Sequence, residues 1–347
     1  MPPAKPVPPL SQPLVFGKFF TEHMARATYT LQKDWHDCEV APYEPIQLAP
    51  AAAALHYGQT VFEGIKAFRL RDRGIGLFRL ERHAQRFRQS CERTCMPVVP
   101  AKMFVEAVST LVRTDGAWIP EAPDASLYVR PAMIATEAFL GVRPAREYLF
   151  FVIASPVGAY YASGFDPVSI WIERDLSRAP VGGLGAAKTG ANYVASLLAS
   201  EKAHDRGYVQ VLWTDAETHD FIEEVGTMNV FVRFRDHVAT PPLTGTLLDG
   251  VTRDCVRRLL ADWAIPAVER PISLDELRKA HEKGDLLEVF GTGTGAVISP
   301  VGRLGWESGT MEIGEGKTGD LARRLFAEIT GIQRGEIADR HGWVTEL

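Results

Sequence analysis

The periodicity of apolar residues changes near the middle of the chain, and this change favours two unlike domains over one continuous fold. Up to about Val157, extended runs such as IKAFRL, SLYVRPAMIAT and YLFFVIASPV surround two stretches of helical periodicity, 82–94 and 102–113. The segment VGAYYASGFDP then interrupts both periodicities. We expect a disordered proline-rich lead-in over 1–13, a small α+β domain over 14–157, a linker over 158–166 and a larger domain over 167–347.

The second half also mixes strands and helices. Extended runs VSIWIERD, VQVLWTD, MNVFVRF and LLEVFGTG occur among the helical stretches NYVASLLASEKAHDRG, VTRDCVRRLLADW, LDELRKAHEKG and TGDLARRLFAEI. With 347 residues, of which 46% are apolar, the chain can fill two cores. We therefore expect an α+β protein with its site in a cleft between the domains, where two walls enclose a ligand without opening either core.

Charge and cysteine content exclude several classes of partner. The net charge of -5 is spread over both signs, so no basic stripe is present to bind nucleic acid or acidic membranes. No apolar run approaches the ~18 residues of a membrane span. The cysteines have unrelated spacings, which predicts neither disulfides nor a metal site and suits a reducing cytoplasm. They are Cys38, Cys91, Cys95 and Cys255.

Lys188 is the strongest candidate for chemistry, although most lysines are simply solvated surface residues. It lies in GLGAAKTGANYVASLLAS, where small neighbours let a planar ligand approach the backbone. An amine kept away from water loses its proton more easily and can then bond to an aldehyde. Pyridoxal phosphate is such an aldehyde, and it also requires a carboxylate at its ring nitrogen, an anion site for its phosphate and a cation.

The chain offers candidates for each of these parts. Glu223 and Glu224 precede MNVFV, and on an extended strand only one of them would face a cleft; an exposed acidic pair is the alternative. The first amides of the helix in DGVTRDCVRR, at Val251 and Thr252, could bind a phosphate, or this could be an ordinary helix start. The stretch 82–93 supplies several arginines, and the pattern alone does not choose among them.

One motif resembles a dinucleotide fingerprint and is set aside. FGTGTGAVISP contains Gly291, Gly293 and Ala296 at the spacing G-x-G-x-x-A after an expected strand. The fingerprint requires a helix next, whereas VISP is β-branched and ends in proline. We expect instead a turn whose amides could hold a carboxylate.

Many short motifs together carry a resemblance to a known family. LHYGQTVFEGIKAF, HAQRF, SLYVRP, PVGAY, KTGANY, QVLW, EEVGTMNVF, TPPL, DGVTRD and EVFGTGTGAVISPV occur in the order found in branched-chain amino acid aminotransferases of fold type IV. The similarity spans about Leu14 to Trp343, and PLVFGKFFTEHM resembles the larger subgroup that includes the mammalian enzymes. The resemblance implies a two-domain fold type IV aminotransferase with the cofactor cleft between a small N-terminal and a larger C-terminal domain.

The resemblance implies pyridoxal phosphate as cofactor and assigns its contacts. Lys188 matches the lysine that bonds to the cofactor and moves the α-proton of the substrate. Tyr193 matches the tyrosine at the cofactor phenolate, and Glu224 has the family's spacing to Asn229 for the partner of the pyridine nitrogen. The remaining cofactor contacts implied are Arg86, Val251, Thr252 and Thr294.

The resemblance also implies a substrate pocket and a homodimer. The amides of Thr294 and Gly295 match the turn that holds the substrate α-carboxylate, with the Tyr128 hydroxyl nearby. Arg130 lies two residues from Tyr128 on the same face of the expected strand, so it could bind the distal carboxylate of glutamate; a structural ion pair is the alternative. The apolar lining implied comprises Phe16, Tyr57, Phe62, Tyr160 and Tyr193, with Val142 from a second subunit.

The implied activity is transamination of L-leucine, L-isoleucine and L-valine with 2-oxoglutarate. A D-amino-acid transaminase or an aminodeoxychorismate lyase would share the fold, and a non-catalytic binding protein is an alternative of another class. Two departures from the family are visible. Ala191 replaces a usual glycine, which would be costly if φ were positive there. Ala296 and Ser299 replace the redox cysteine pair of the mammalian enzymes, so we expect that regulation to be missing.

Overall fold

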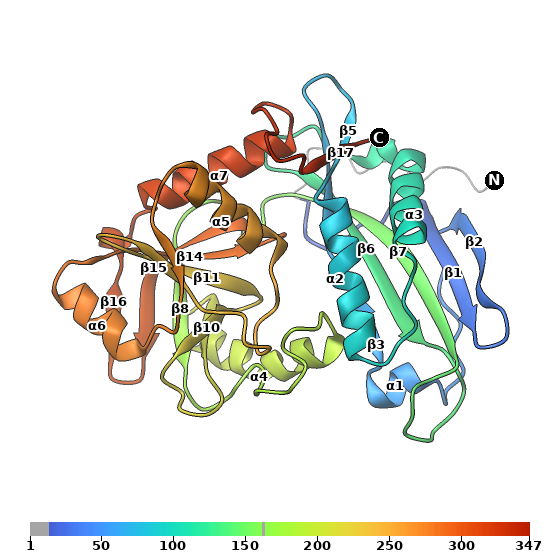
Figure 1. Cartoon of the computed structure of the whole chain (residues 1–347), viewed down its shortest axis with the longest axis horizontal. Helices are drawn as coiled ribbons and strands as arrows, with labels where there is room; N and C mark the ends of the chain where they lie inside the picture. Colours follow the sequence, from blue (N-terminus) through green and yellow to red (C-terminus); the bar gives the residue numbers. More distant parts are fainter. Residues whose placement is uncertain (1–13, 162–163) are drawn as a thin grey trace. The chain divides into compact units, whose positions relative to one another are not determined.

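The computed structural model describes residues 14–161 and 164–347. The expected lead-in, 1–13, lies outside the described residues, as do 162 and 163 of the expected linker. The chain forms two compact units (Figure 1). The first comprises the described residues up to Tyr160 together with Ala187–Gly190 and Gly331–Leu347, and the second comprises the described residues of Tyr161–Ala186 and Ala191–Thr330. The sequence pattern had placed the two short added segments in the second domain.

An antiparallel sheet forms the first unit, in the order β17-β5-β4-β6-β7-β1-β2, with β3 paired to β6. Along β6, side chains alternate between the two faces, so that Leu127, Val129 and Met133 enter the core while Tyr128 and Arg130 lie on the opposite face. The strands are β1 (His23–Thr30), β2 (Asp34–Pro42), β3 (Thr60–Phe62), β4 (Ile65–Arg69), β5 (Ile75–Phe78), β6 (Ser126–Ala135), β7 (Glu147–Val157) and β17 (Val344–Glu346).

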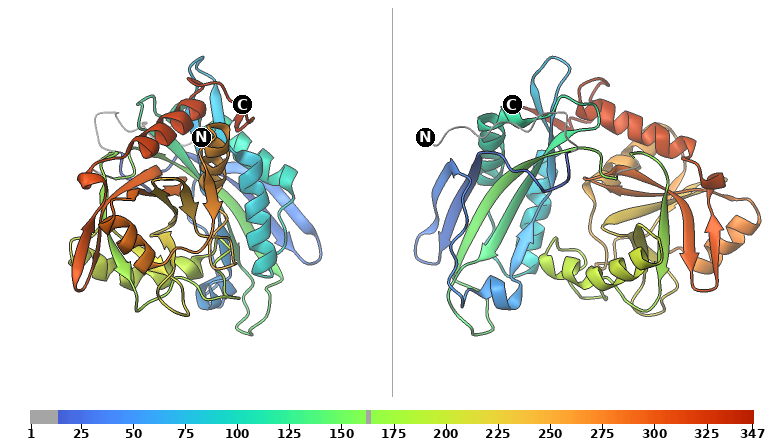
Figure 2. Two further views of the ribbon diagram at one scale, coloured as in Figure 1. Left: turned by 60° about the vertical axis from the view of Figure 1, so that its left-hand side comes forward. Right: turned by 180° about the vertical axis from the view of Figure 1, so that it is seen from behind.

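Two amphipathic helices, α2 (Leu80–Arg93) and α3 (Ala101–Thr114), cover the core face of this sheet (Figures 1 and 2). Phe87 on α2 and Phe104 on α3 both pack on Phe150 of β7, with ring centroids 5.6 and 5.9 Å away. Burial of such apolar faces supplies most of the stability of short helices. Both helices match the predicted stretches 82–94 and 102–113 to within two residues. The unit also contains α1 (Ala53–Tyr57) and the short η1 (Gly116–Trp118).

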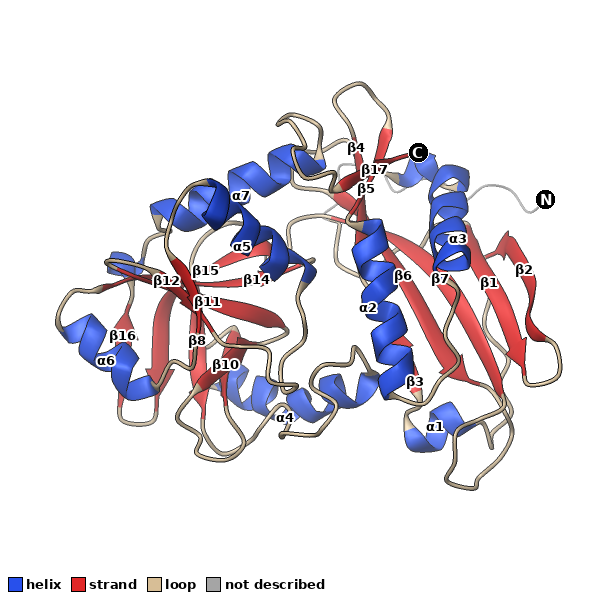
Figure 3. Cartoon of the chain, viewed as in Figure 1, coloured by secondary structure: helices blue, strands red, loops and turns tan. Residues whose placement is uncertain are grey.

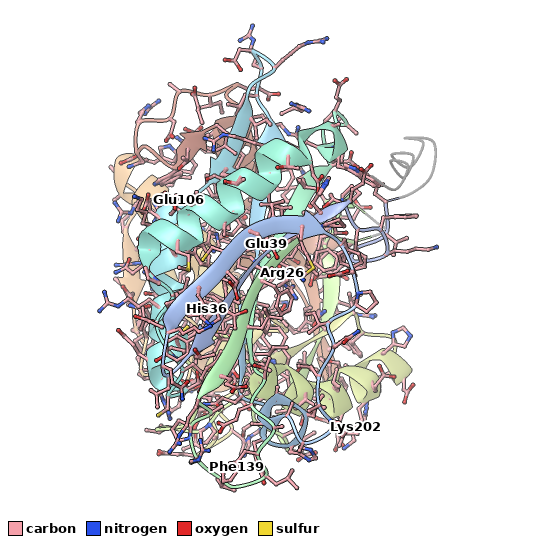
Figure 4. All side chains as sticks on the ribbon, turned by 90° about the vertical axis from the view of Figure 1, so that its right-hand side faces the viewer. Arg26, His36, Glu39, Glu106, Phe139 and Lys202 are labelled. Carbon is pink, nitrogen blue, oxygen red and sulfur yellow. The ribbon has the colours of Figure 1, made fainter. Side chains whose placement is uncertain are left out.

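The edge of the first sheet is polar. Strand β2 is mostly exposed, and Arg26 on β1 forms an ion pair with Glu39 on β2, with 2.7 Å between Nη2 and Oε1 (Figure 4). Charged side chains on an exposed edge strand discourage pairing with a further strand. The sheet therefore ends at β2 without exposing an apolar edge.

The second unit is built on a sheet that closes on itself. Its order is β10-β9-β8-β15-β14-β11-β12-β13, and because β10 also pairs with β11, the six strands from β10 to β11 form a ring around an apolar core. Strand β16 pairs with β15. The strands are β8 (Val168–Glu173), β9 (Gln210–Thr214), β10 (Ile222–Val225), β11 (Met228–Phe234), β12 (Val238–Thr240), β13 (Ala267–Glu269), β14 (Leu286–Gly293), β15 (Val297–Trp306) and β16 (Gly309–Glu312).

Four helices and the short η2 (Gly314–Gly316) accompany this sheet: α4 (Gly190–Asp205), α5 (Val251–Asp262), α6 (Leu274–Glu282) and α7 (Asp320–Gln333). Their first turns are stabilised in different ways. The Ser273 hydroxyl accepts the Glu276 amide of α6, and the buried Glu288 carboxylate accepts the amides of Leu321 and Ala322 in α7. Helix α5 begins after Gly250 without any side-chain cap.

The α+β class expected from the sequence is confirmed, since both units combine helices with a sheet (Figure 3). The VISP run begins strand β15 instead of a helix, which removes the dinucleotide interpretation. Over 14–161 and 164–347, no helix is long and apolar enough to span a membrane. The same residues contain no cluster of three or more potential metal ligands.

Candidate active site

Lys188 is held by its backbone within the first unit. Its amide donates to the Ser90 hydroxyl on α2 at 2.9 Å, and its carbonyl accepts the Phe62 amide of β3 at 3.0 Å. The next residue, Thr189, donates its hydroxyl to the Thr60 carbonyl at 2.7 Å. The half-buried lysine side chain therefore projects from a backbone fixed on both sides.

The Phe62 ring lies near two basic side chains. Lys188 Nζ lies 5.1 Å from the ring centroid, and Arg130 Cζ lies 4.7 Å from the same centroid. Arg130 Nη2 donates to the Tyr128 hydroxyl at 3.1 Å. The Phe16 ring is 4.8 Å from the Tyr128 ring and 6.5 Å from the Tyr160 ring, edge to face in both cases. Lys188 and most of the predicted substrate residues of the first unit are thus joined by contacts.

Arg86 is buried and bound to an acid that the sequence analysis did not single out. Its Nε and Nη2 donate to the two carboxylate oxygens of Glu63 at 2.7 and 2.9 Å, and His83 Nδ1 lies 2.8 Å from Glu63 Oε2. Burial alone would raise the pKa of Glu63, but the charge of Arg86 and the hydrogen bonds from Arg86 and His83 hold that pKa well below its ordinary value. Burial lowers the pKa of His83, so its neutral ring donates the Nδ1 proton to the carboxylate.

Tyr57 and Val142 occupy another part of the first unit. Tyr57 ends α1 and donates its hydroxyl to the Leu140 carbonyl. Val142 follows in the same loop and is 87% exposed. Nearby Phe139 and Leu140 are exposed as well (Phe139 is labelled in Figure 4).

Glu224 is the better-bound acid of the predicted pair in the second unit. Its Oε1 accepts the Leu248 amide at 2.9 Å and the Asn229 side-chain amide at 3.2 Å, and its Oε2 lies 3.0 Å from Arg178 Nε. Glu224 and Asn229 face each other across the β10–β11 pair. Arg178 was not predicted, because no pattern around it in the sequence marks it as a partner of a distant strand.

Glu223 is also buried, although the sequence pattern suggested that it would face away or be exposed. Its Oε1 accepts the Thr246 hydroxyl at 2.6 Å, while its Oε2 has no hydrogen-bond partner among the described residues. Burial raises the pKa of Glu223 to about 6, against the opposing effects of Thr246 and Arg178. The register of β9 and β10 shifts between Ile222 and Val225, which breaks simple alternation where the two acids lie.

The start of α5 lies beside the Glu224 cluster. A Cβ at Gly250 would come within 1.9 Å of Asn229 Oδ1, so a larger residue there would displace the Asn229 side chain. Asn229 donates to Glu224 and to the Leu248 carbonyl. Val251 and Thr252 begin the helix and are buried, and its first amides have no side-chain cap. One unit thus presents a buried carboxylate and a helix N-terminus linked by a single asparagine.

The remaining predicted residues of the second unit lie on α4 and on the β14–β15 hairpin. Tyr193 is half-buried in the first turn of α4. Thr294 and Gly295 form the tip of the hairpin between Gly293 and Val297, as the turn interpretation expected. Ala191 is exposed and is not among the residues with positive φ, so the methyl group costs no backbone strain.

These donors fit pyridoxal phosphate by their chemistry. The start of α5, which has no side-chain cap, suits a phosphate, and the buried Glu224, balanced by Arg178, suits a protonated pyridine nitrogen. Lys188 supplies the amine and Arg86 a buried guanidinium. Phe62 and Tyr193 add aromatic surface for an apolar side chain. The set contains each part that the cofactor requires.

Comparison with known proteins gives a consistent result. The sequence profile described as amino-transferase class IV matches residues 60–304. Branched-chain-amino-acid aminotransferase 2 of Bacillus subtilis (strain 168) is 47% identical over 343 residues, covering 99% of this chain and 94% of that protein. The branched-chain-amino-acid aminotransferase of Mycolicibacterium smegmatis is 45% identical over 337 residues, covering 96% and 92%.

Solved structures agree with the sequence relatives. The crystal structure of the Escherichia coli branched-chain amino acid aminotransferase has a TM-score of 0.77 and 28% identity, covering 92% of this chain and 98% of that one. The T.th. branched-chain amino acid aminotransferase with pyridoxamine 5'-phosphate gives 0.76 and 28% with the same coverage. The chain therefore belongs to the class IV aminotransferases of fold type IV, and it is a transaminase that uses pyridoxal 5'-phosphate.

Proposed function

We propose that this transaminase moves the amino group of L-leucine, L-isoleucine and L-valine to 2-oxoglutarate, giving the branched-chain 2-oxo acids and L-glutamate. The observation that carries the proposal is the Phe62 ring, which lies against both Lys188 Nζ and the Arg130 guanidinium. An aromatic wall suits an apolar side chain, and a guanidinium suits the second carboxylate of glutamate. The names of the relatives support branched-chain amino acids as substrates.

The cofactor, when bound, supplies an electron sink conjugated to the substrate amine. Lys188 then moves the proton at the substrate α-carbon, which requires its amine to stay beside that carbon. Glu224 holds the proton on the pyridine nitrogen, and Arg178 balances its charge. The phosphate is held by the amides of Val251 and Thr252.

Three further residues complete the proposed cofactor site. Arg86 adds its charge to the phosphate site, Tyr193 donates to the phenolate oxygen, and Thr294 contributes from the β14–β15 hairpin. These assignments come from matching each residue to the family pattern, and the buried arginine and the uncapped start of α5 support the phosphate site.

Substrate binding uses a different group of residues. The amides of Thr294 and Gly295, with the Tyr128 hydroxyl, hold the α-carboxylate, because amides at a turn bind anions without burying a charge. The apolar lining proposed comprises Phe16, Tyr57, Phe62, Tyr160 and Tyr193.

Arg130 would allow the pocket to bind substrates that carry a second carboxylate. Its Nε is buried and has no hydrogen-bond partner among the described residues, while its Nη2 donates to the Tyr128 hydroxyl, which carries no charge. A partly buried guanidinium whose described hydrogen bond goes to an uncharged hydroxyl can still pair with a substrate carboxylate. We therefore assign Arg130 to the distal carboxylate of glutamate and 2-oxoglutarate rather than to a structural ion pair.

A homodimer completes the proposal. Each unit exposes apolar side chains: Val142 and Leu140 in the first, and Val194, Leu197 and Leu198 on α4 in the second. A second copy would cover such surfaces, and Val142 would then line the partner's pocket. The four cysteines are free, which suits a cytoplasmic location.

An absorption spectrum of the purified protein, recorded before and after addition of L-leucine, tests the function. A protein that carries the cofactor absorbs visible light, and L-leucine should change the spectrum when its amino group is transferred. D-alanine should produce no change, which separates the proposal from a D-amino-acid transaminase. A protein that binds no cofactor, or that responds to D-alanine and not to L-leucine, would contradict it.

Arg130→Met tests the assignment of the distal carboxylate. Loss of one charge-assisted hydrogen bond costs about 1.5–3 kcal/mol, roughly tenfold to hundredfold in the half-reaction with glutamate. The half-reaction with L-leucine should change far less in single-turnover kinetics. Arg26→Met is the matched control, because Arg26 pairs with Glu39 on the surface of the same unit. Equal losses in both half-reactions would make Arg130 structural.

A further inference from the structure

We propose that Glu63 is a positioning residue whose carboxylate fixes the Arg86 guanidinium in the orientation that binds the cofactor phosphate. The inference rests on the proposed function, in which Arg86 is the phosphate arginine. Glu63 itself would touch neither cofactor nor substrate. Its effect on phosphate binding would pass through Arg86.

Arg86 and Glu63 form a bidentate ion pair. Arg86 Nε lies 2.7 Å from Glu63 Oε1 and Arg86 Nη2 lies 2.9 Å from Glu63 Oε2. Two parallel bonds between planar groups fix both the position and the plane of the guanidinium, which a single bond does not. His83, one turn before Arg86 on α2, bonds to Glu63 Oε2 and thereby prevents the carboxylate from rotating.

The cluster is buried as a whole. Glu63 is 0% exposed, His83 is 1% and Arg86 is 4%. A carboxylate taken out of water is expensive unless it is paired and hydrogen-bonded, and apolar residues of similar size often serve a fold as well. A charged cluster kept at this depth therefore indicates a use for its fixed geometry.

The same elements also fix Lys188 relative to Arg86. Glu63 directly follows Phe62, whose amide donates to the Lys188 carbonyl at 3.0 Å. Ser90, one turn after Arg86, accepts the Lys188 amide at 2.9 Å and donates to the Arg86 carbonyl at 3.1 Å. Because Glu63 ties β3 to α2, it joins the two contacts that hold the Lys188 backbone. The amine and the guanidinium thus belong to one connected framework within the first unit.

A simpler role for Glu63 makes the opposite prediction. If the carboxylate only neutralised a buried arginine, removing its charge would leave Arg86 more positive and would strengthen phosphate binding or leave it unchanged. If the carboxylate positions Arg86, its removal weakens phosphate binding despite the gain in net positive charge. The sign of the change therefore separates the two roles.

The experiment measures the affinity of the full chain, freed of cofactor by dialysis, for pyridoxal phosphate and for pyridoxal, through quenching of tryptophan fluorescence. The dissociation constant for pyridoxal divided by that for pyridoxal phosphate measures the contribution of the phosphate alone, and a smaller ratio means a weaker preference for the phosphorylated ligand. Glu63→Gln removes the charge. Glu63→Asp keeps the charge but shortens the side chain, which disrupts the bidentate pair with Arg86. Both should lower the preference for the phosphorylated ligand by roughly tenfold to hundredfold, as expected for a lost charge-assisted bond.

Glu288→Gln is the matched control, because Glu288 is a buried carboxylate of the second unit that binds Arg233 and the start of α7. It should leave the ratio unchanged, whatever it does to stability. A structural role for Glu63 would weaken both ligands by one factor and also leave the ratio unchanged.

An unchanged or increased ratio in both Glu63 variants would overturn the inference. Failure of both variants to fold would overturn it too, because the fold and not Arg86 would then require the carboxylate. The proposed function fails by a different result, namely a wild-type protein that binds no cofactor or does not respond to L-leucine. A wild type that does both, with Glu63 variants of normal ratio, contradicts only the role given to Glu63.

Discussion

Replacing each of the two adjacent acids by glutamine should affect the stability of the protein very differently, even without cofactor. Glu224 accepts two hydrogen bonds at Oε1 and lies 3.0 Å from Arg178 Nε at Oε2. Glu223 accepts one hydrogen bond at Oε1, and its buried Oε2 has no hydrogen-bond partner within the described part of the chain. A substitution of the same size and shape therefore removes very different interactions at the two positions.

The cost at Glu224 follows from what Arg178 would lose. The glutamine oxygen can still accept the Leu248 and Asn229 donors, but the amide NH₂ then points at the guanidinium of Arg178. Removing one partner of a buried ion pair costs about 3–5 kcal/mol. Arg178 keeps the carbonyl oxygens of Gly185 and Thr246 as acceptors, so the lower end, about 3 kcal/mol, is expected.

The cost at Glu223 should be small and should depend on pH. The glutamine oxygen can accept Thr246, and the NH₂ replaces the oxygen that accepts no hydrogen bond from the described residues, so a change within about 1 kcal/mol is expected at neutral pH. Burial raises the pKa of Glu223 from 4.5 to about 6, so the folded protein binds this proton more tightly than the unfolded chain does. The contribution of Glu223 to stability is therefore fully present below pH 4.5 and decreases as pH rises to about 6.

Urea unfolding of the cofactor-free protein, followed by tryptophan fluorescence, measures both effects. Glu224→Gln should shift the midpoint to lower urea by a clear margin, and Glu223→Gln should not. Between pH 4.5 and 6, Glu223→Gln should also lack a decrease in stability that the wild type shows. Equal destabilisation by the two substitutions, or a larger effect at Glu223, would refute the account of how Arg178 is paired.

Other predictions concern catalysis, pH and oxidation. Lys188→Ala should abolish transamination with the fold intact, since loss of a general acid/base alone costs about 10²–10⁴-fold; near-normal turnover with L-leucine would contradict the role of the lysine. Burial, aided by the charge of Arg334, lowers the pKa of Lys66 from 10.5 to about 8. The free energy of unfolding should therefore rise as pH increases from about 8 to 10.5, and Lys66→Met should remove this rise in pH-dependent unfolding curves. Mild peroxide should leave activity unchanged, because Ala296 and Ser299 stand where a redox pair would be; a loss that thiols reverse would disprove this.

Elements with strong periodicity could be predicted from the sequence. Helix α2 was predicted because its apolar residues recur on one face, and α5 because a turn at Asp249 and Gly250 precedes a helical pattern. The absence of a helix at VISP was predicted from its β-branched residues and proline, and the structure has strand β15 there. Each signal is local, so the sequence alone contains it.

The location of the Lys188 segment could not be predicted in this way. Residues Ala187–Gly190 belong to the first unit through bonds to Ser90, Phe62 and Thr60, all far away in the sequence. The local pattern of small residues indicated a close approach to something, but not to which element. The order of residues along the chain had assigned Ala187–Gly190 to the second domain, together with the residues that follow.

The partners of buried charged residues are also hard to predict from the sequence. Glu63 stands in TVFEGIKAF, an apolar run in which a carboxylate should be paired if it is buried, and His83 and Arg86 share one face of a helix. Those two signals together could have suggested the cluster before the structure. No comparable signal exists for Arg178, because it lies in an irregular segment between β8 and α4.

The acid pair shows why a correct rule can still mislead at a functional position. Alternation along an extended strand would turn Glu223 and Glu224 to opposite faces. In the structure both are buried and both interact with the charge of Arg178, and the register between β9 and β10 shifts between Ile222 and Val225, where the two acids lie. Such irregularities are frequent beside active sites, since they redirect one side chain without ending the strand. Here the shift lies beside Glu223, a buried acid whose Oε2 accepts no hydrogen bond from the described residues. Its neighbour Glu224 is the acid assigned to the pyridine nitrogen. Only the pairing of the strands in the structure reveals this shift.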